Sequence, residues 1–222
     1  MLEQEINILK NSNTFEEYIH KEEYERFRSR VLMIVANQAL EGIYFYSGFL
    51  LIYLFGRQGK MLGSTTMIRF IHRDELNHTT LFSSIFRIIH KENIKKFNKE
   101  LYKECIEILT KAALLEIRWG QYVTQDKIQG ITNQQIEEYV KYLANDRFKK
   151  LGLNKIESLN PPFPEGPFIN PLPWINKFSK LEETKTNFFE GDNKSYDNSG
   201  LNIDKFNFEP KLFQEMLKKE VK

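Results

Sequence analysis

Proline is absent from residues 1–160, and all seven prolines of this 222-residue chain stand from Pro161 onward. Because proline interrupts helices, so long a stretch without it favours long helices. Strict alternation of apolar and polar residues, which is typical of half-buried strands, is also lacking. With one cysteine, Cys105, no disulfide can form within the chain, so we expect a reducing, cytoplasmic setting.

An excess of charge is lacking as well, since 32 basic residues face 30 acidic ones and the net charge is +2. Such a balance argues against a nucleic-acid partner. The N-terminus has no basic patch followed by an apolar run, so we expect no signal peptide. The longest apolar run, about Ile43–Phe55, is shorter than the roughly 20 residues of a membrane span. We therefore expect a buried helix there and no membrane partner.

Helical periodicity is what the sequence does have. We expect an all-α fold in which one helix continues from about residue 14 through Glu41 into Phe55. Further helices are expected over the ranges 64–90, 94–124 and 133–150. Residues 1–155 would then form the helical bundle portion of the molecule.

The character of the chain changes in residues 156–222. A proline-containing irregular segment comes first, followed by a polar stretch that is rich in turn-forming residues. Apolar residues at helical spacing return in the last stretch, Pro210–Lys222. We expect an irregular C-terminal tail whose end forms an amphipathic helix on a partner protein.

Metal-binding chemistry is suggested by Glu75 and His78, which form an E-x-x-H pattern inside a predicted helix. Residues three positions apart share a helix face, so the carboxylate and the imidazole can reach the same ion. Glu41 lies in the preceding apolar helix, where an unpaired carboxylate would be costly. Helical bundles with di-iron or di-manganese sites combine single glutamates with E-x-x-H pairs in this way.

Simpler interpretations of these residues exist, because E-x-x-H patterns are common in helical proteins. His78 can be a histidine of the core, and Glu41 can pair with Arg73 or with a lysine. The combination favours the metal site, since Glu41, Phe45 and Phe49 are spaced at i, i+4 and i+8. On a continuous helix that spacing places an aromatic wall on the same face as the carboxylate.

Four segments in this order resemble the C-terminal half of the ribonucleotide reductase small (beta) subunit. They are LEGIYFYSGF (Leu40–Phe49), IHRDELNH (Ile71–His78), NPLPWI (Asn170–Ile175) and TNFFEG (Thr186–Gly191). The similarity covers most of residues 25–200. It implies a ferritin-like helical bundle that is incomplete, with its N-terminal helices absent.

The resemblance also implies a function and a cofactor. The family's small subunit generates the radical that is used to reduce ribonucleotides to deoxyribonucleotides. A complete subunit would hold two ions, as dinuclear Fe, Mn or mixed Mn/Fe. The partner would be the large (alpha) subunit, which the C-terminal tail would contact. The family's tail is typically acidic, whereas this chain ends in MLKKEVK.

Residue roles follow from the same resemblance. Glu41, Glu75 and His78 would be metal ligands. Asp74 and Tyr196 would carry the radical toward the large subunit. The residues expected to support the centre are Arg73, which would neutralise nearby carboxylates, and Phe45, Phe49 and Ile71, which would form a dry radical pocket.

A second E-x-x-H pattern, Glu17 to His20 with Tyr24 after it, resembles the missing half of such a site. We interpret it as a coincidence. The 24 residues from Glu17 to Glu41 would span roughly 36 Å on a continuous helix. The intervening residues contain no glycine or proline that would turn the chain back.

The sequence thus supplies three of the usual six ligands and no radical tyrosine. We expect a truncated form, one product of a split gene, or a remnant, and a chain that is inactive alone. It would need self-association or a polypeptide carrying the missing half. The alternatives are a non-catalytic protein that binds the large subunit, or another ferritin-like carboxylate-metal protein.

Overall fold

Long helices dominate the computed structural model, which describes residues 12–179, and this part of the chain contains no strand. The main helices are α2 (Ser12–Gly42), α3 (Tyr46–Arg57), α4 (Leu62–Glu92), α5 (Lys99–Thr124) and α6 (Asn133–Lys150), with the short α7 (Asn176–Ser179) last. Three 3₁₀ turns lie between them, η1 (Ile94–Lys96), η2 (Leu153–Lys155) and η3 (Pro173–Ile175). The predicted all-α fold is confirmed for these residues. Tyr196, TNFFEG and the predicted terminal helix lie outside them.

Helices α5 and α6 begin where local signals indicate. The side chain of Asn98 accepts a hydrogen bond from the backbone N–H of Leu101 and so caps α5. A capping box between Thr132 and Gln135 opens α6. The prediction for 133–150 matches α6, and the prediction for 64–90 differs from α4 by two residues at each end. The helix predicted over 94–124 is divided into η1 and α5.

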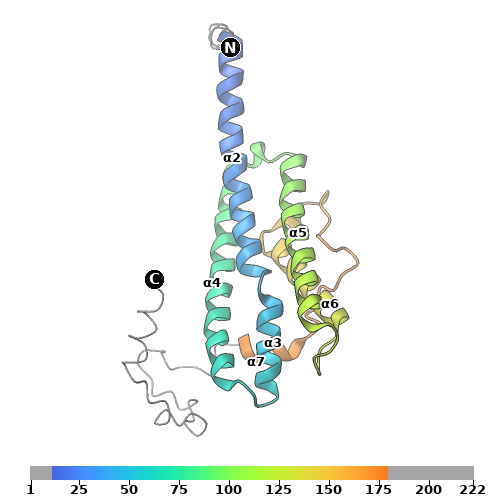
Figure 1. Cartoon of the computed structure of the whole chain (residues 1–222). Helices are drawn as coiled ribbons and strands as arrows, with labels where there is room; N and C mark the ends of the chain where they lie inside the picture. The colour runs from blue at the N-terminus through green and yellow to red at the C-terminus, as the bar shows by residue number, and fades with distance from the viewer. Residues whose placement is uncertain (1–11, 180–222) are drawn as a thin grey trace, which may run out of the picture. The chain divides into compact units, whose positions relative to one another are not determined.

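One hydrophobic core joins these helices, because α2 packs against α4 and α5, and α5 packs against α6 (Figure 1). Its fully buried members recur at helical spacing. They include Val31, Val35 and Ala39 of α2, Leu109 and Ala113 of α5, and Ile136 and Val140 of α6. Cys105 of α5 is also fully buried, and its thiol is free.

The expectation of one continuous helix from residue 14 into Phe55 is wrong. The chain leaves helical geometry at residues 43–45, and Phe45 adopts the left-handed conformation with φ of 59°. For a residue with a side chain this conformation costs about 1–2 kcal/mol, so neighbouring groups must stabilise it. The break separates Glu41 from Phe45 and Phe49, which therefore do not continue one helical face.

The segment His20–Arg57 is long and apolar enough, by length and composition, to cross a membrane. More than half of its most apolar window, 56%, is buried inside the protein. It is also divided into α2 and α3 by the break. These features are typical of a core helix, which can have the same length and apolar composition as a membrane span.

Candidate metal centre

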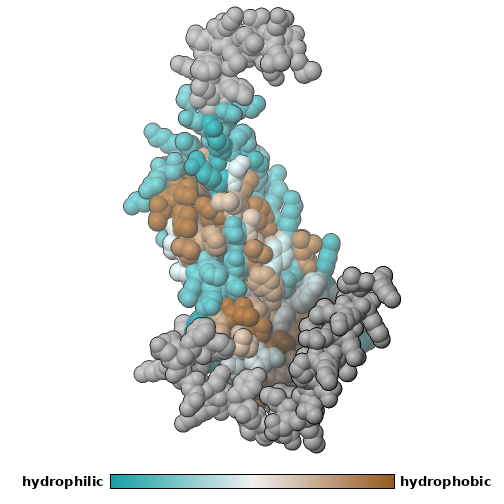
Figure 2. Space-filling view, turned by 60° about the vertical axis from the view of Figure 1, so that its left-hand side comes forward, coloured by the Kyte–Doolittle hydropathy of each residue, from teal (hydrophilic) through white to brown (hydrophobic). Residues whose placement is uncertain are grey.

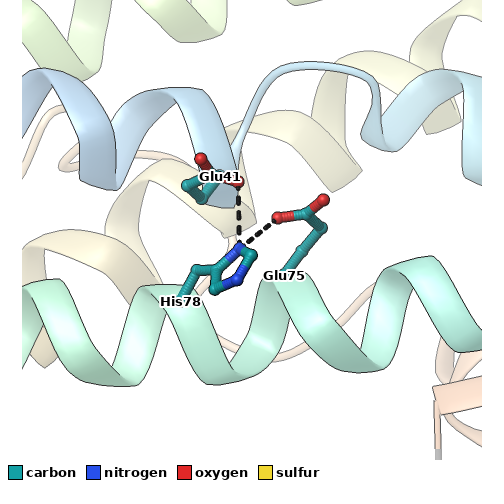
Figure 3. A group of neighbouring side chains, drawn as sticks. All are labelled: Glu41, Glu75 and His78. Carbon is teal, nitrogen blue, oxygen red and sulfur yellow. Dashed lines mark hydrogen bonds and ion pairs between the residues drawn. The ribbon is translucent and has the colours of Figure 1, made fainter.

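Glu41, Glu75 and His78 meet where α2 ends beside the middle of α4 (Figure 3). His78 Nδ1 lies 2.9 Å from Glu75 Oε2 and 3.4 Å from Glu41 Oε2. One ligand atom from each residue falls within 4.8 Å of the other two. A single cation placed among them could contact all three, and the i, i+3 spacing predicted this for Glu75 and His78.

The three side chains differ in exposure, with side-chain values of 15% for Glu75, 21% for Glu41 and 50% for His78. Burial raises the pKa of Glu75, and the adjacent Glu41 carboxyl raises it further. The hydrogen bond to Glu75 raises the pKa of His78. Two carboxylates held so close together repel each other unless a proton or a cation lies between them, and here the imidazole takes that place.

Exposed apolar residues recur along α4 before and after His78. Counting along α4 in alternating steps of four and three residues from Met67 defines a stripe that includes His78 near its middle. The exposed members of this α4 stripe are Met67, Ile71, Asp74, His78, Leu81 and Ile88. Figure 2 shows hydrophobic residues gathered in patches on the described surface, bordered by hydrophilic ones. Spacing of this kind is typical of a helix that packs against another helix.

The simpler interpretations of the ligand residues do not hold. His78 is half exposed and is not a core histidine. Glu41 pairs with His78, whereas Arg73 bonds to its neighbour Asp74 at 3.1 Å. The Asp74 side chain is 54% exposed.

The residues expected to form the radical pocket have different environments. Phe49 is buried and its ring lies 5.4 Å from that of His72, centroid to centroid. Phe45, 38% exposed, and Ile71, 42% exposed, face outward instead. Phe45 still contacts Phe49, with 5.8 Å between ring centroids.

The second E-x-x-H pattern is remote from this centre. Helix α2 is unbroken between His20 and Glu41, which separates them by roughly 31 Å along the axis. The His20 side chain is 77% exposed and pairs loosely with Glu23. Tyr24 accepts a hydrogen bond from Asn98. Figure 1 shows the first part of α2 projecting beyond its neighbours.

Two charged residues near the centre were missed in the sequence. Glu116 of α5 is buried and accepts hydrogen bonds from the backbone N–H groups of Phe45 and Ser47, at 3.2 and 2.8 Å. Burial raises its pKa, and these hydrogen bonds oppose the shift. Arg147 of α6 is also buried, and its Nε donates to the carbonyl oxygen of Gly42 at 3.0 Å. The available signal for Glu116 was a single carboxylate inside the apolar run AALLEI.

A third missed residue is His72, buried on the inner side of α4. Tyr53 Oη lies 2.9 Å from His72 Nδ1, and the Tyr46 ring meets the imidazole edge to face at 5.1 Å. Burial lowers the pKa of His72 to about 4, with smaller effects from Arg147 and Lys150. The imidazole is therefore neutral at pH 7.

Comparison with known proteins identifies the family of this chain. The model of the family described as ribonucleotide reductase, small chain, matches residues 1–158. The chain belongs to the ribonucleotide reductase small-chain family.

Relatives in this family include named reductase subunits. Ribonucleoside-diphosphate reductase subunit beta of Treponema pallidum is 37% identical over 77% of this chain and 47% of its own length. The subunit beta of Halalkalibacterium halodurans is 38% identical over 73% of this chain and 45% of its own length. The solved R2 subunit from Clostridium botulinum matches with a TM-score of 0.60 and 42% identity, covering 67% of this chain and 44% of that one. The chain thus spans about half the length of the relatives it matches.

Ribonucleotide reductase small subunits are ferritin-like, di-metal carboxylate proteins, and the described helices fit that architecture. Carboxylate oxygens and a neutral imidazole form a donor set that suits iron or manganese. The group formed by Glu41, Glu75 and His78 has this composition. It fits one side of a dimetal centre, in which each ion needs further ligands.

Proposed function

We propose that this chain contributes half of the dimetal centre of a ribonucleoside-diphosphate reductase small subunit. The observation that carries the proposal is the convergence of Glu41, Glu75 and His78 within 4.8 Å. In the reduction of ribonucleotides to deoxyribonucleotides, the bound Fe or Mn pair supplies one-electron redox chemistry with dioxygen. Here the three side chains act as ligands.

Each residue has a role that its surroundings support. Glu75 and Glu41 offer carboxylate oxygens that are largely shielded from water, which strengthens their attraction for a cation. His78 must be neutral to bind metal, so its raised pKa makes metal binding compete with protons. Arg73 offsets the charge of Asp74, to which it is bonded. Phe49 excludes water behind the ligands, with Phe45 and Ile71 completing an apolar border.

The missing ligands would approach from the exposed side of His78. The α4 stripe presents apolar residues before and after His78, which suits a helix that lies along α4 and brings further carboxylates. We propose that this helix comes from a polypeptide carrying the missing half, or from a further copy of the chain. The radical would then pass by Asp74 and Tyr196 to the large subunit, with residues 156–222 forming the segment that contacts it.

Metal binding tests the ligand assignment directly. We expect the purified chain to bind Mn²⁺, measured by the loss of the free-ion electron paramagnetic resonance signal during titration. Glu75→Ala and His78→Ala should each weaken this binding at least tenfold. Glu107→Ala is the matched control, because Glu107 is an acidic residue on α5 that pairs only with exposed lysines in the described structure. Equal affinity in all four proteins would contradict the assignment.

A reductase assay tests the wider proposal. The chain is mixed with the large subunit, an Fe²⁺ or Mn²⁺ supply, dioxygen, and a polypeptide carrying the complementary ligands and a tyrosine. Deoxyribonucleotide formation that needs both polypeptides and Glu75 is the expected result. Binding to the large subunit without turnover under every combination would favour a non-catalytic role.

A further inference from the structure

The break between α2 and α3 lies directly after the metal ligand Glu41, and its free backbone groups have identifiable partners. The N–H of Tyr44 reaches back to the carbonyl of Ala39 at 3.3 Å. The N–H groups of Phe45 and Ser47 both donate to Glu116, one to each carboxylate oxygen. Buried N–H groups left without partners are costly, so Glu116 of α5 stabilises the donor side of the break.

Arg147 of α6 stabilises the acceptor side. Its Nε donates to the carbonyl of Gly42, the residue next to Glu41. The rest of the guanidinium is fixed by Asp146 at 2.6 Å and by the Tyr46 hydroxyl at 3.2 Å. Gly42 permits this approach, since a Cβ there would lie 2.5 Å from Arg147 Nε. Two opposite charges from two different helices therefore hold the ends of one break.

We propose that Glu116 and Arg147 are positioning residues for the metal ligand Glu41. By holding the break at residues 43–45, they end α2 at Gly42 and keep Glu41 on its last turn, facing Glu75 and His78 on α4. This inference rests on the proposed function, because it treats Glu41 as a ligand.

The arrangement indicates positioning because both bonds act on the backbone on either side of Glu41's turn. No side chain of its own segment caps α3 at Phe45, which is held in a left-handed conformation, so Glu116 supplies the acceptor for its N–H. If Glu116 is removed, the N–H groups of Phe45 and Ser47 lose their acceptor and the break can rearrange, and each residue that joins or leaves a helix rotates its end by about 100°. Such a rotation on one side of the break moves Glu41 relative to α4.

Amide hydrogen exchange resolved to single residues gives the first readout, in metal-free protein. Glu116→Ala should speed exchange at Phe45 and Ser47 at least tenfold. Glu116→Gln retains one acceptor oxygen and should leave one of the two amides protected, so it carries the test if the alanine variant does not fold. Glu104→Gln is the matched control, because Glu104 also lies on α5 and also reaches α2, through Arg28 at 2.6 Å. Glu104→Gln should leave the exchange rates of both amides unchanged.

Mn²⁺ titration gives the second readout. We expect Glu116→Ala to weaken Mn²⁺ binding about tenfold, within the range found for residues that orient metal ligands, while Glu104→Gln binds as the wild type does. Unchanged exchange at Phe45 and Ser47 would overturn the proposal. So would faster exchange with unchanged Mn²⁺ affinity.

A wild type that binds no Mn²⁺ would contradict the proposed function instead. The positioning role is then decided in metal-free protein by the nuclear Overhauser contact between the Glu41 and His78 side chains. Its loss in Glu116→Ala, but not in Glu104→Gln, supports positioning. Its persistence in Glu116→Ala overturns it.

Discussion

A histidine inside an aromatic cluster gives the protein a dependence on pH at the scale of single residues. His72 is 3% exposed and accepts or donates one hydrogen bond with Tyr53. Arg147 and Lys150 add a positive field that disfavours a second proton. The folded protein therefore keeps His72 neutral, with a pKa of about 4, against about 6.5 in an unfolded chain.

The unfolded state consequently binds the extra proton first as the pH falls. The stability due to neutral His72 is complete above pH 6.5 and is lost progressively down to pH 4. The full loss amounts to roughly 3 kcal/mol of unfolding free energy. The free energy of unfolding, measured in urea, should fall less from pH 7 to pH 4.5 in His72→Asn than in the wild type. Asparagine keeps a polar partner for Tyr53 but does not titrate. The same drop in both proteins would count against this role.

At the scale of helices, α6 approaches α2 closely at Gly42. An added Cβ would meet Arg147 Nε at 2.5 Å and Thr79 Cγ2 at 3.1 Å. Gly42→Ala should therefore lower the free energy of unfolding by about 1–3 kcal/mol, measured in urea. Gly63→Ala is the control, because Gly63 lies in α4 with nothing within 4 Å of an added Cβ. It should instead stabilise the protein by up to about 1 kcal/mol. A loss of similar size at both positions would remove the close-approach explanation.

The sequence predicted the helices well and the break not at all. Apolar periodicity and the lack of proline indicate α4, α5 and α6, because those signals are local. The break consists of Ile43, Tyr44 and Phe45, and the segment GIYFY was interpreted as part of an apolar helix despite Gly42 before the break. It depends on Glu116 and Arg147, which lie about 70 and 100 positions away in the chain. Tertiary contacts of that kind leave no periodic signal.

The candidate site, like the helices, could be predicted only where its signals are local in the sequence. Glu75 and His78 could be paired from their spacing, Glu41 was indicated as a carboxylate in an apolar helix, and the resemblance named all three as ligands. Their convergence follows from α2 and α4 packing side by side. The environment of the site could not be anticipated, because the outward positions of Phe45 and Ile71 depend on the break and on which face of α4 is covered.

At the scale of the whole molecule, the α4 stripe should drive association. Transferring Leu81 and Ile88 from water into an interface is worth about 1.5–3 kcal/mol for each side chain. Leu81→Lys with Ile88→Lys should weaken self-association at least tenfold in sedimentation equilibrium. Thr80→Lys with Ser84→Lys adds the same charge to α4 outside the stripe and should change association little. If both double variants weaken self-association equally, the added charge explains the weakening and the α4 stripe does not.

The single thiol of Cys105 is fully enclosed in α5, and burial raises its pKa to about 12. Thiolate, which is the form that attacks alkylating and disulfide reagents, is therefore almost absent at neutral pH. A reagent can reach this sulfur only when the core around α5 opens. The rate at which Cys105 reacts with a thiol reagent therefore measures how often that part of the core opens. A second cysteine placed on the surface would accept a spectroscopic label while Cys105 stays unreacted.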